Sequence, residues 1–250
     1  MQEVLAPDEP SPAERPAIAS TPLAARRDRT TATRRLSVSP ERSAHEEGED
    51  DAPPPSSGRL LGTFRNTYYS FPDAADFTGA DATLYDAACT PIATVPKDFH
   101  DRLCVQGSGR IAGGRTVSFA KRGCDCASLC PRTGQKICYE ALDPARFPWG
   151  RGAAGKPITP FRSIAVDTSI IPLGTPVFIS AFAGKATPDG WIHDGCFVAI
   201  DRGLKVVGQS VDVFTGSEKS TATWNALVGT GVGVEIYADD ARCRADSPPR

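Results

Sequence analysis

The stretch that decides the fold reads FRSIAVDTSIIPLGTPVFISAF (residues 161–182), followed by CFVAIDRGLKVVGQSVDVFTGS (residues 196–217). Its short apolar runs are β-branched or aromatic and are bounded by Gly, Pro, Thr or Ser, which predicts strands rather than helices. The runs are 164–166, 177–179, 197–200 and 211–214. Asp167, Asp201 and Asp212 then fall at or near strand ends, where a sheet holds a carboxylate rigidly beside a groove built from loops.

The chain from Arg59 onward continues as short strands joined by turns. The expected elements are strands at 60–71, 116–120 and 231–237, a hairpin at 83–95 and a short helix at 221–228. Residues 121–139 are expected to form a basic, cysteine-rich loop, and residues 142–160 irregular connecting structure. Many short strands with few helices indicate a closed barrel, because closure removes exposed strand edges.

Residues 1–57 are expected to be a disordered tail. They contain no Phe, Trp, Tyr or Cys and hold 9 of the 22 prolines. Such a segment does not offset the backbone entropy of about 1 to 2 kcal/mol per ordered residue, because it buries too few apolar side chains. Residues 58–245 are expected to form one barrel domain with a cysteine-rich insertion around 121–160.

The charge balance excludes a general attraction to polyanions. The chain holds 28 Lys plus Arg against 30 Asp plus Glu, a formal net charge of -2, so we expect no nucleic-acid partner. No apolar run approaches the roughly 20 residues that a membrane span needs. Nothing in the sequence indicates a cofactor, and a monomer is expected.

All eight cysteines lie between Cys89 and Cys243. An even number at this density is typical of a disulfide framework formed in an oxidising compartment. The alternative is a metal site in Cys124-Asp-Cys126-Ala-Ser-Leu-Cys130 with Cys138, but this spacing departs from the paired C-x2-C knuckles of common zinc modules, and no His lies nearby. We therefore expect disulfides and no metal site.

Cysteine usage indicates export to an oxidising compartment, and the expected location is extracytoplasmic: the periplasm, the outer membrane or the cell exterior. Met1–Pro16 has neither a basic start followed by an apolar core nor a cleavage-like end, so no signal peptide is visible. A true start upstream of Met1 is the expectation that reconciles the two observations.

Asp201 and Asp212 are expected to form a carboxylate pair. A strand ending at Asp201, a turn from Gly203 to Gly208 and a returning strand through Asp212 would place the two on neighbouring strands. An isolated Asp has a pKa of about 3.9, but burial or a second carboxylate raises it. One of the pair is therefore expected to keep its proton near neutral pH.

Four blocks of sequence occur in a fixed order. They are Thr67-Tyr68-Tyr69, Val105-Gln-Gly-Ser-Gly-Arg-Ile111, Ser163-Ile-Ala-Val-Asp167-Thr-Ser-Ile-Ile-Pro-Leu-Gly-Thr175, and Val198-Ala-Ile-Asp201-Arg-Gly with Gly208-Gln-Ser-Val-Asp212-Val-Phe-Thr-Gly216. Together they resemble the three-aspartate domain of the membrane-bound lytic murein transglycosylase A family. The resemblance implies a mainly β fold, a six-stranded double-psi β-barrel with irregular disulfide-bonded insertions.

The resemblance also implies an activity on peptidoglycan glycan strands. Enzymes of this family cleave the bond between N-acetylmuramic acid and N-acetylglucosamine without water. One aspartate protonates the leaving oxygen and then takes the proton of the muramic acid 6-hydroxyl, which closes a 1,6-anhydro ring. Asp212 matches this residue, Asp201 matches a carboxylate that supports the oxocarbenium-like transition state, and Asp167 matches the first aspartate and looks more structural.

Four further residues are expected to bind substrate. Tyr68 and Tyr69 cannot both face the core from one strand, so one faces outward, where a tyrosine stacks on a sugar ring. The glycines around Ser108 predict a tight turn that lets backbone amides and the Gln106 amide approach a substrate. The alternative is that the outward ring covers a loop and the turn has no function.

The chain departs from the family pattern in two ways. Arg202-Gly203-Leu204-Lys205 stands where the family has paired glycines, and its larger side chains would narrow the groove or alter its specificity. The segment between Ile111 and Asp167 is short and cysteine-rich, which indicates a reduced or rebuilt second lobe.

Two alternative functions stay open. One is an expansin-like barrel that binds wall glycan without cleaving it. The other is a hydrolase in which Asp201 or Asp167 activates water, with carboxylates about 6.5 to 9.5 Å apart. Any single aspartate at a strand end also serves as a turn residue. A nucleophilic triad is not supported, because none of the three histidines lies in a nucleophile-elbow context; the residues concerned are Ser108, Ser169, Ser217, His45, His100 and His193.

Overall fold

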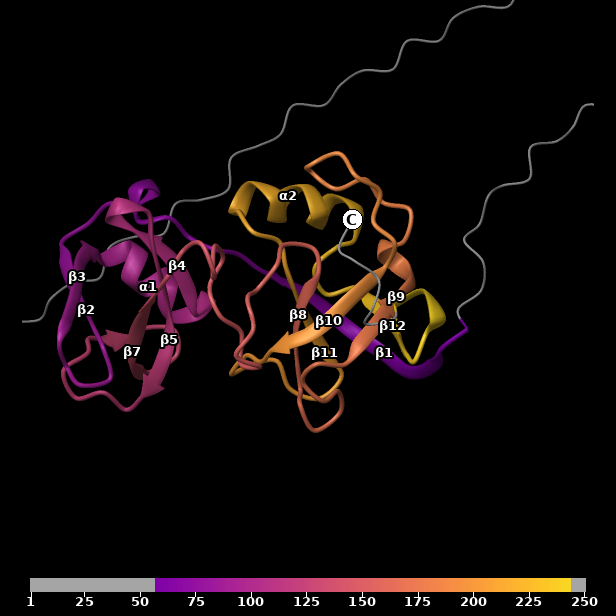
Figure 1. Ribbon diagram of the computed structural model, residues 1–250, viewed down its shortest axis with the longest axis horizontal. Coiled ribbons are helices and arrows are strands. Elements are labelled where there is room, and N and C mark those ends of the chain that lie inside the picture. Colours follow the sequence, from indigo (N-terminus) through magenta and orange to yellow (C-terminus); the bar gives the residue numbers. More distant parts are fainter. Residues whose placement is uncertain (1–56, 244–250) are drawn as a thin grey trace, which may run out of the picture. The chain divides into compact units, whose positions relative to one another are not determined.

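The computed structural model describes residues 57–243, and the expectation of a disordered tail lies, apart from Ser57, outside them. Six strands form a closed barrel in the order β1-β11-β8-β10-β9-β12, and Figure 1 shows them with helix α2 beside the barrel. Their bounds are β1 Arg59–Tyr69, β8 Ser163–Val166, β9 Pro176–Ile179, β10 Cys196–Asp201, β11 Ser210–Phe214 and β12 Gly233–Ala238. The predicted six-stranded barrel is confirmed.

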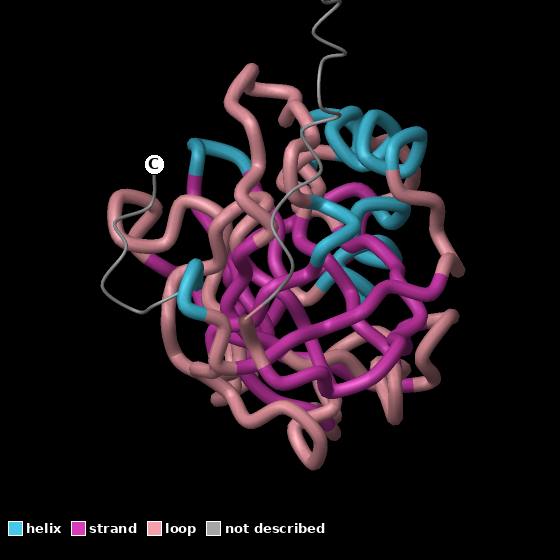
Figure 2. The backbone as a smooth tube through the Cα atoms, turned by 90° about the vertical axis from the view of Figure 1, so that its right-hand side faces the viewer, coloured by secondary structure: helices cyan, strands magenta, loops and turns pink. Residues whose placement is uncertain are grey.

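The barrel mixes parallel and antiparallel pairs. β1 pairs with β11 and β10 with β8 in parallel, while the other four neighbouring pairs are antiparallel. Parallel neighbours require crossover connections rather than hairpins, which agrees with the double-psi topology. Figure 2 shows the strands grouped together with the loops and helices around them.

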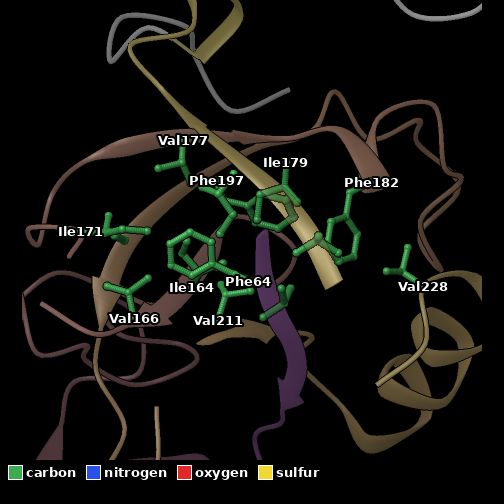
Figure 3. Close-up of a cluster of buried hydrophobic side chains, with 14 of the residues drawn as sticks. Phe64, Ile164, Val166, Ile171, Val177, Ile179, Phe182, Phe197, Val211 and Val228 are labelled. Atoms are coloured by element: carbon green, nitrogen blue, oxygen red, sulfur yellow. The ribbon is translucent and has the colours of Figure 1, made fainter. Parts of the chain in front are cut away.

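Alternation along the strands builds the barrel core. Ile164 and Val166 on β8 and Val211 and Val213 on β11 point inward and are almost fully buried, as expected from the period of two in a strand. Figure 3 shows this apolar cluster, with Phe64 of β1 among its members. The residues between these positions, such as Ala165 and Asp212, face outward. The outer wall of the barrel can therefore carry polar side chains.

Residues between β1 and β8 form a lobe of their own. It holds a two-stranded sheet β2-β3 and a four-stranded sheet β4-β5-β7-β6, which pack with α1 around Phe99, Leu103 and Val117. The elements are β2 Asp81–Tyr85, β3 Pro91–Pro96, α1 Lys97–Gln106, β4 Ser108–Ile111, β5 Arg115–Arg122, β6 Leu129–Cys130 and β7 Gln135–Leu142, with 3-10 turns η1 Ala74–Asp76 and η2 Ala112–Gly114. The hairpin expected at 83–95 and the strand expected at 116–120 are both present.

Helix α1 and strand β7 were not expected from the sequence. α1 is ten residues long, and charged residues separate its few buried side chains. Two of the buried side chains, Phe99 and Leu103, lie on one face of the helix. The helix ends at Gly107, which has a positive φ of 81°. The Gly107 N–H caps the helix by donating a hydrogen bond to the Leu103 carbonyl. The sequence around Ser108 was expected to form an isolated turn. In the structure Gly107 ends α1 and Gly109 lies in β4. β7 lacks a simple alternation, because its residues 137–139 are all buried.

The disulfide framework is confirmed. The four pairs are Cys89–Cys126, Cys104–Cys130, Cys124–Cys138 and Cys196–Cys243. Three of them tie together the lobe, and the fourth joins β10 to the last turn, η4 Ala241–Cys243. The thiols of the alternative zinc site are therefore all used in disulfides.

The short helix expected near 221–228 is α2, Glu218–Leu227. Ser217 precedes it and accepts a hydrogen bond from the Ser220 N–H at 3.1 Å, which caps the first turn. Its Trp224 is buried in the barrel core beside Phe182 of the 3-10 turn η3, Ser180–Phe182. Within residues 57–243, no helix has the length and apolar character that crossing a membrane requires.

Candidate active site

Three strands bring Asp201 and Asp212 to the two sides of Ala165. Asp201 of β10 pairs with Ala165 of β8, and Asp212 of β11 pairs with the same Ala165 from the other side. Residues that pair across strands project from the same face of a sheet. Two strand spacings put the two aspartate Cα atoms about 10 Å apart. The small Ala165 side chain leaves the space between the carboxylates open.

The expectation that the two aspartates lie on neighbouring strands is wrong, because β8 lies between β10 and β11. Strand β8 runs parallel to β10 and antiparallel to β11. The turn from Gly203 to Gly208 therefore crosses over one strand rather than closing a hairpin. The consequence is a wider separation of the carboxylates than a hairpin would give.

A bulge at Ile200 turns Asp201 toward this face. Ala199 pairs with Ile164, but the next pair is Asp201 with Ala165, so Ile200 is one extra residue in β10. Phe197 and Ala199 face the core, and strict alternation would place residue 201 there as well. The extra residue sends the Asp201 side chain outward instead, which is how bulges re-aim side chains beside functional sites.

Residues 152–154 hold the bulge in place. The Ala154 N–H donates to the Ile200 carbonyl at 2.9 Å. A side chain at Gly152 would meet the same carbonyl, since a Cβ there would lie 2.5 Å from its oxygen. Glycine at 152 is therefore required for the close approach of this segment to β10.

The Asp212 carboxyl group is half-buried and has one hydrogen-bond donor among the described residues. The Thr67 hydroxyl donates to it at 2.9 Å from the paired position on β1. Burial raises the pKa of Asp212 to about 6, the Thr67 hydrogen bond opposes this rise, and the charge of Asp201 adds to it. Near neutral pH this carboxyl group can hold or release a proton.

The Asp201 carboxyl group accepts more hydrogen bonds from the protein than the Asp212 carboxyl group does. Its Oδ1 accepts the backbone N–H groups of Ala153 at 3.1 Å and Arg202 at 2.9 Å, and its Oδ2 accepts the Tyr69 hydroxyl at 3.4 Å. Burial raises the pKa of Asp201, and these donors counteract the rise because they stabilise the ionised form. The difference in donors favours Asp212 as the group that keeps its proton and Asp201 as the anion.

Both carboxyl groups line one cavity of about 750 Å³. This volume suits a few sugar rings, since ligand sites commonly span about 300 to 1,000 Å³. The cavity is bounded by the outer wall of the barrel, the β10–β11 loop and the lobe. The predicted site residues that line it are Asp201, Asp212, Tyr69, Gln106 and Ser108.

The two tyrosines go to opposite faces, as expected. Tyr69 lies in the cavity wall, with its ring centroid 4.9 Å from that of Phe214 and its hydroxyl on Asp201. Burial raises the pKa of Tyr69 well above its ordinary value, and the neighbouring carboxylates raise it further. Tyr68 packs against the barrel core, donates its hydroxyl to the Val228 carbonyl and lines a second cavity of about 510 Å³.

Gln106 and Ser108 make structural contacts at the cavity wall. The Gln106 side-chain oxygen accepts the Ser70 N–H at 2.9 Å, just after β1. The buried Ser108 hydroxyl lies 2.7 Å from that of Ser118, which also accepts the Arg151 N–H at 3.0 Å. Ser108 therefore helps to place the segment that contacts Asp201, and its hydroxyl is occupied by protein.

Asp167 is not brought to the cavity. Its Oδ1 accepts the N–H and the hydroxyl of Ser169 at 3.0 and 2.7 Å, and its Oδ2 accepts the Gly208 N–H at 2.7 Å. The Ser169 hydroxyl contributes most to a pKa of Asp167 that lies below its ordinary value. The geometry is that of a turn residue that fixes the end of the β10–β11 loop.

Three parts of the site were not identified from the sequence. Thr67 stands two residues before Tyr69 on the same face of β1, and this spacing was the available signal for it. Ala165 gave none, because a small residue in an apolar strand looks like any core position. Gly152 and Ala153 lie in a segment without periodicity and reach Asp201 only through tertiary structure.

Comparison with solved structures finds similar proteins, and three of them share 16 to 18% identity with this chain. E. coli MltA with bound chitohexaose has a TM-score of 0.49 and 17% identity over 71% of each chain. A membrane-bound lytic murein transglycosylase from Agrobacterium tumefaciens has a TM-score of 0.49 and 16% identity over 71% of this chain and 73% of that one. The lytic transglycosylase LtgG of Burkholderia pseudomallei has a TM-score of 0.39 and 18% identity over 71% and 72%.

Comparison of the sequence with curated proteins gives no significant match. A family model does match part of the chain, over residues 162–231, and it is that of the 3D domain. The matched segment contains β8 to β11 and all three aspartates. The resemblance to the three-aspartate domain seen in the sequence is thereby confirmed, and residues 162–231 match the model of that domain.

Proposed function

We propose that this protein is a lytic transglycosylase that cleaves the glycosidic bonds of peptidoglycan and leaves 1,6-anhydromuramic acid ends. The observation that carries the proposal is the pair of half-buried carboxyl groups on either side of Ala165, one of which has a pKa of about 6. Glycosidic cleavage needs a carboxylic acid that is protonated near neutral pH.

Asp212 serves as the acid and then as the base. It first protonates the oxygen of the leaving N-acetylglucosamine, and the bond to the muramic acid carbon breaks. As a carboxylate, it then takes the proton of the muramic acid 6-hydroxyl, whose oxygen attacks that carbon and closes the anhydro ring. The proton on Asp212 is restored, so no water is consumed.

Asp201 acts as a fixed negative charge. Its hydrogen bonds from Ala153, Arg202 and Tyr69 favour the ionised form, and a carboxylate beside the cavity stabilises the positive charge that develops on the sugar ring. Tyr69 contributes an aromatic wall to the same cavity, where a sugar ring can stack.

The proposal extends to where the protein acts. Four disulfides within residues 89–243 are typical of proteins folded in an oxidising compartment. We place the protein outside the cytoplasm, at the cell wall, as a monomer. Sedimentation of the purified full chain tests the oligomeric state, and fractionation of cells tests the location.

Product analysis tests the activity. Purified cell wall is incubated with the wild type and with Asp212→Asn, and soluble muropeptides are identified by mass spectrometry. We expect anhydro ends from the wild type and a loss of about a hundredfold to ten-thousandfold in the variant, since an amide does not serve as a general acid. Products heavier by one water would favour the hydrolase, and binding without any product would favour the expansin-like alternative.

A further inference from the structure

The cavity that holds Asp201 and Asp212 concentrates positive charge. Six cationic side chains line it against three acidic ones, so three positive charges remain in excess even when both aspartates are ionised. The whole chain, in contrast, has a formal net charge of -2. The residues are Arg122, Arg132, Arg146, Arg151, Arg202 and Lys205 against Glu140, Asp201 and Asp212.

Half of these cations are already engaged by the protein. Arg151 forms an ion pair with Glu140. Arg122 donates to the Gln135 side chain at 3.0 Å and lies over the Phe119 ring. Arg146 lies over the Phe147 ring, 5.0 Å from its centroid. These contacts hold the three arginines in place and neutralise one of them.

The other three cations form what we call the cationic rim: Arg132, Arg202 and Lys205. Within residues 57–243, none of the three takes part in an ion pair, and all are exposed. The charges of Arg132 and Lys205 are therefore available to a ligand, and that of Arg202 also acts on the neighbouring Asp201.

The rim residues come from two parts of the chain that face one cavity. Arg202 and Lys205 lie in the β10–β11 loop directly after Asp201. Arg132 lies in the turn between β6 and β7 of the lobe, and it also lines the second cavity together with Gln106. A ligand at the carboxylates thus has cations beside it on the barrel and on the lobe.

We propose that the cationic rim binds the carboxylates of the peptide stems, so that the protein acts on stem-bearing glycan in preference to bare glycan. This inference rests on the proposed function. Glycan without stems carries one carboxylate per repeat, on the lactyl group of muramic acid, whereas an intact stem carries several free carboxylates and offers the rim more counter-charge. The stem is attached to muramic acid, the sugar at which Asp212 would act. Its attachment point therefore lies beside the scissile bond.

The test measures binding without cleavage. Asp212→Asn is the host, and the probes are glycan strands with intact stems and the same strands after enzymatic removal of the stems. We expect about tenfold tighter binding of stem-bearing strands, falling to about twofold when Arg132→Gln and Lys205→Gln are added, as for the loss of partly exposed charge-assisted contacts. Amidation of the stem carboxylates should have the same effect.

A matched pair of substitutions controls for net charge. Lys121→Gln with Lys219→Gln also removes two exposed cations, from β5 and α2, and neither lines either cavity. This control should keep the tenfold preference. Thermal unfolding of both double variants checks that they are folded, and Arg132→Lys should retain most of the preference.

Several outcomes would overturn the inference. They are equal binding of both glycans by the host, an equal loss in the control, or equally strong binding of a phosphate-rich wall polymer, which would indicate a general polyanion site. The two proposals fail separately. Stem-dependent binding without any cleavage product rejects the transglycosylase alone, whereas cleavage with no stem dependence rejects the role of the rim alone.

Discussion

The proton on Asp212 is controlled by a small number of opposing contributions. Burial raises the pKa of its carboxyl group to about 6 and the charge of Asp201 adds to the rise, whereas the Thr67 hydroxyl and the charge of Arg65 lower it. A pKa in this range suits a group that must donate a proton and then accept one, because the protonated and the ionised carboxyl groups are both populated near neutral pH.

The Thr67 hydroxyl should therefore set the pH range of activity. Since Asp212 must be protonated to act as the acid, kcat/KM is expected to fall as pH rises through about 6. Thr67→Val removes a donor that stabilises the ionised form, so the pKa rises and the descending limb moves to higher pH. The measurement is the pH profile of anhydro-muropeptide release. Thr63→Val, at an exposed position of the same strand, is the control, and a limb that stays in place or moves lower would contradict the assignment.

At the scale of elements, the decisive feature is the single extra residue in β10. The apolar run 197–200 correctly predicted a strand, and in the structure Phe197 and Ala199 of this strand face the core. Alternation could not identify which face Asp201 occupies, because a bulge is set by contacts with the 152–154 segment, about 50 positions away in the sequence. Asp212, in a regular strand, shows the face that its own alternation predicts.

The remaining differences from prediction have similar causes. The position of β8 between β10 and β11 depends on pairing over long sequence separations, which local patterns do not report. Helix α1 is too short for a clear period, and its stability comes from packing of Phe99 and Leu103 against the lobe. Motif order predicted candidate site residues, and the structure brings Asp201 and Asp212 to one cavity, whereas Asp167 lies in a turn that fixes a loop.

Gly152→Ala tests the bulge. A Cβ at this position would meet the Ile200 carbonyl oxygen at 2.5 Å, so the segment must move away from β10 and the Ala153 hydrogen bond to Asp201 should weaken. We expect a loss in kcat of about tenfold to a hundredfold, as for a misplaced catalytic group. Gly155→Ala is the comparison, because its added Cβ meets no atom within 4 Å and brings only the strain of a positive φ.

For that pair of variants, a larger loss in Gly155→Ala than in Gly152→Ala would show that general loop strain, not the approach to Ile200, controls the site. Circular dichroism confirms that both variants retain the barrel.

At the scale of the whole molecule, the barrel is built from both ends of the folded chain. β1 pairs with β11 and β12, so residues near 65 contact residues near 212 and 235. Thr67 and Asp212 are 145 positions apart in the sequence. The Cys196–Cys243 disulfide adds a covalent link between β10 and the turn after β12.

Loss of this disulfide should lower global stability. It joins residues 47 positions apart, and closing a loop of that length stabilises the folded state by about 4 kcal/mol through the entropy of the unfolded chain. Urea denaturation of Cys196→Ser with Cys243→Ser should show a decrease of about 2 to 4 kcal/mol in the free energy of unfolding. Cys89→Ser with Cys126→Ser is the comparison within the lobe, and an unchanged midpoint for the first variant would contradict this role.

The place of β1 in the barrel has a consequence for biogenesis. During synthesis this strand leaves the ribosome well before either of its partners, and the lobe that follows can form its own local contacts in the meantime. β1 therefore remains without a barrel partner until β11 has been made, because residues 65–69 of β1 pair with residues of β11 that lie 145 positions later in the chain. The barrel therefore closes only when nearly the whole folded part of the chain is available, and until then β1 presents unpaired edges, which promote aggregation of incomplete chains.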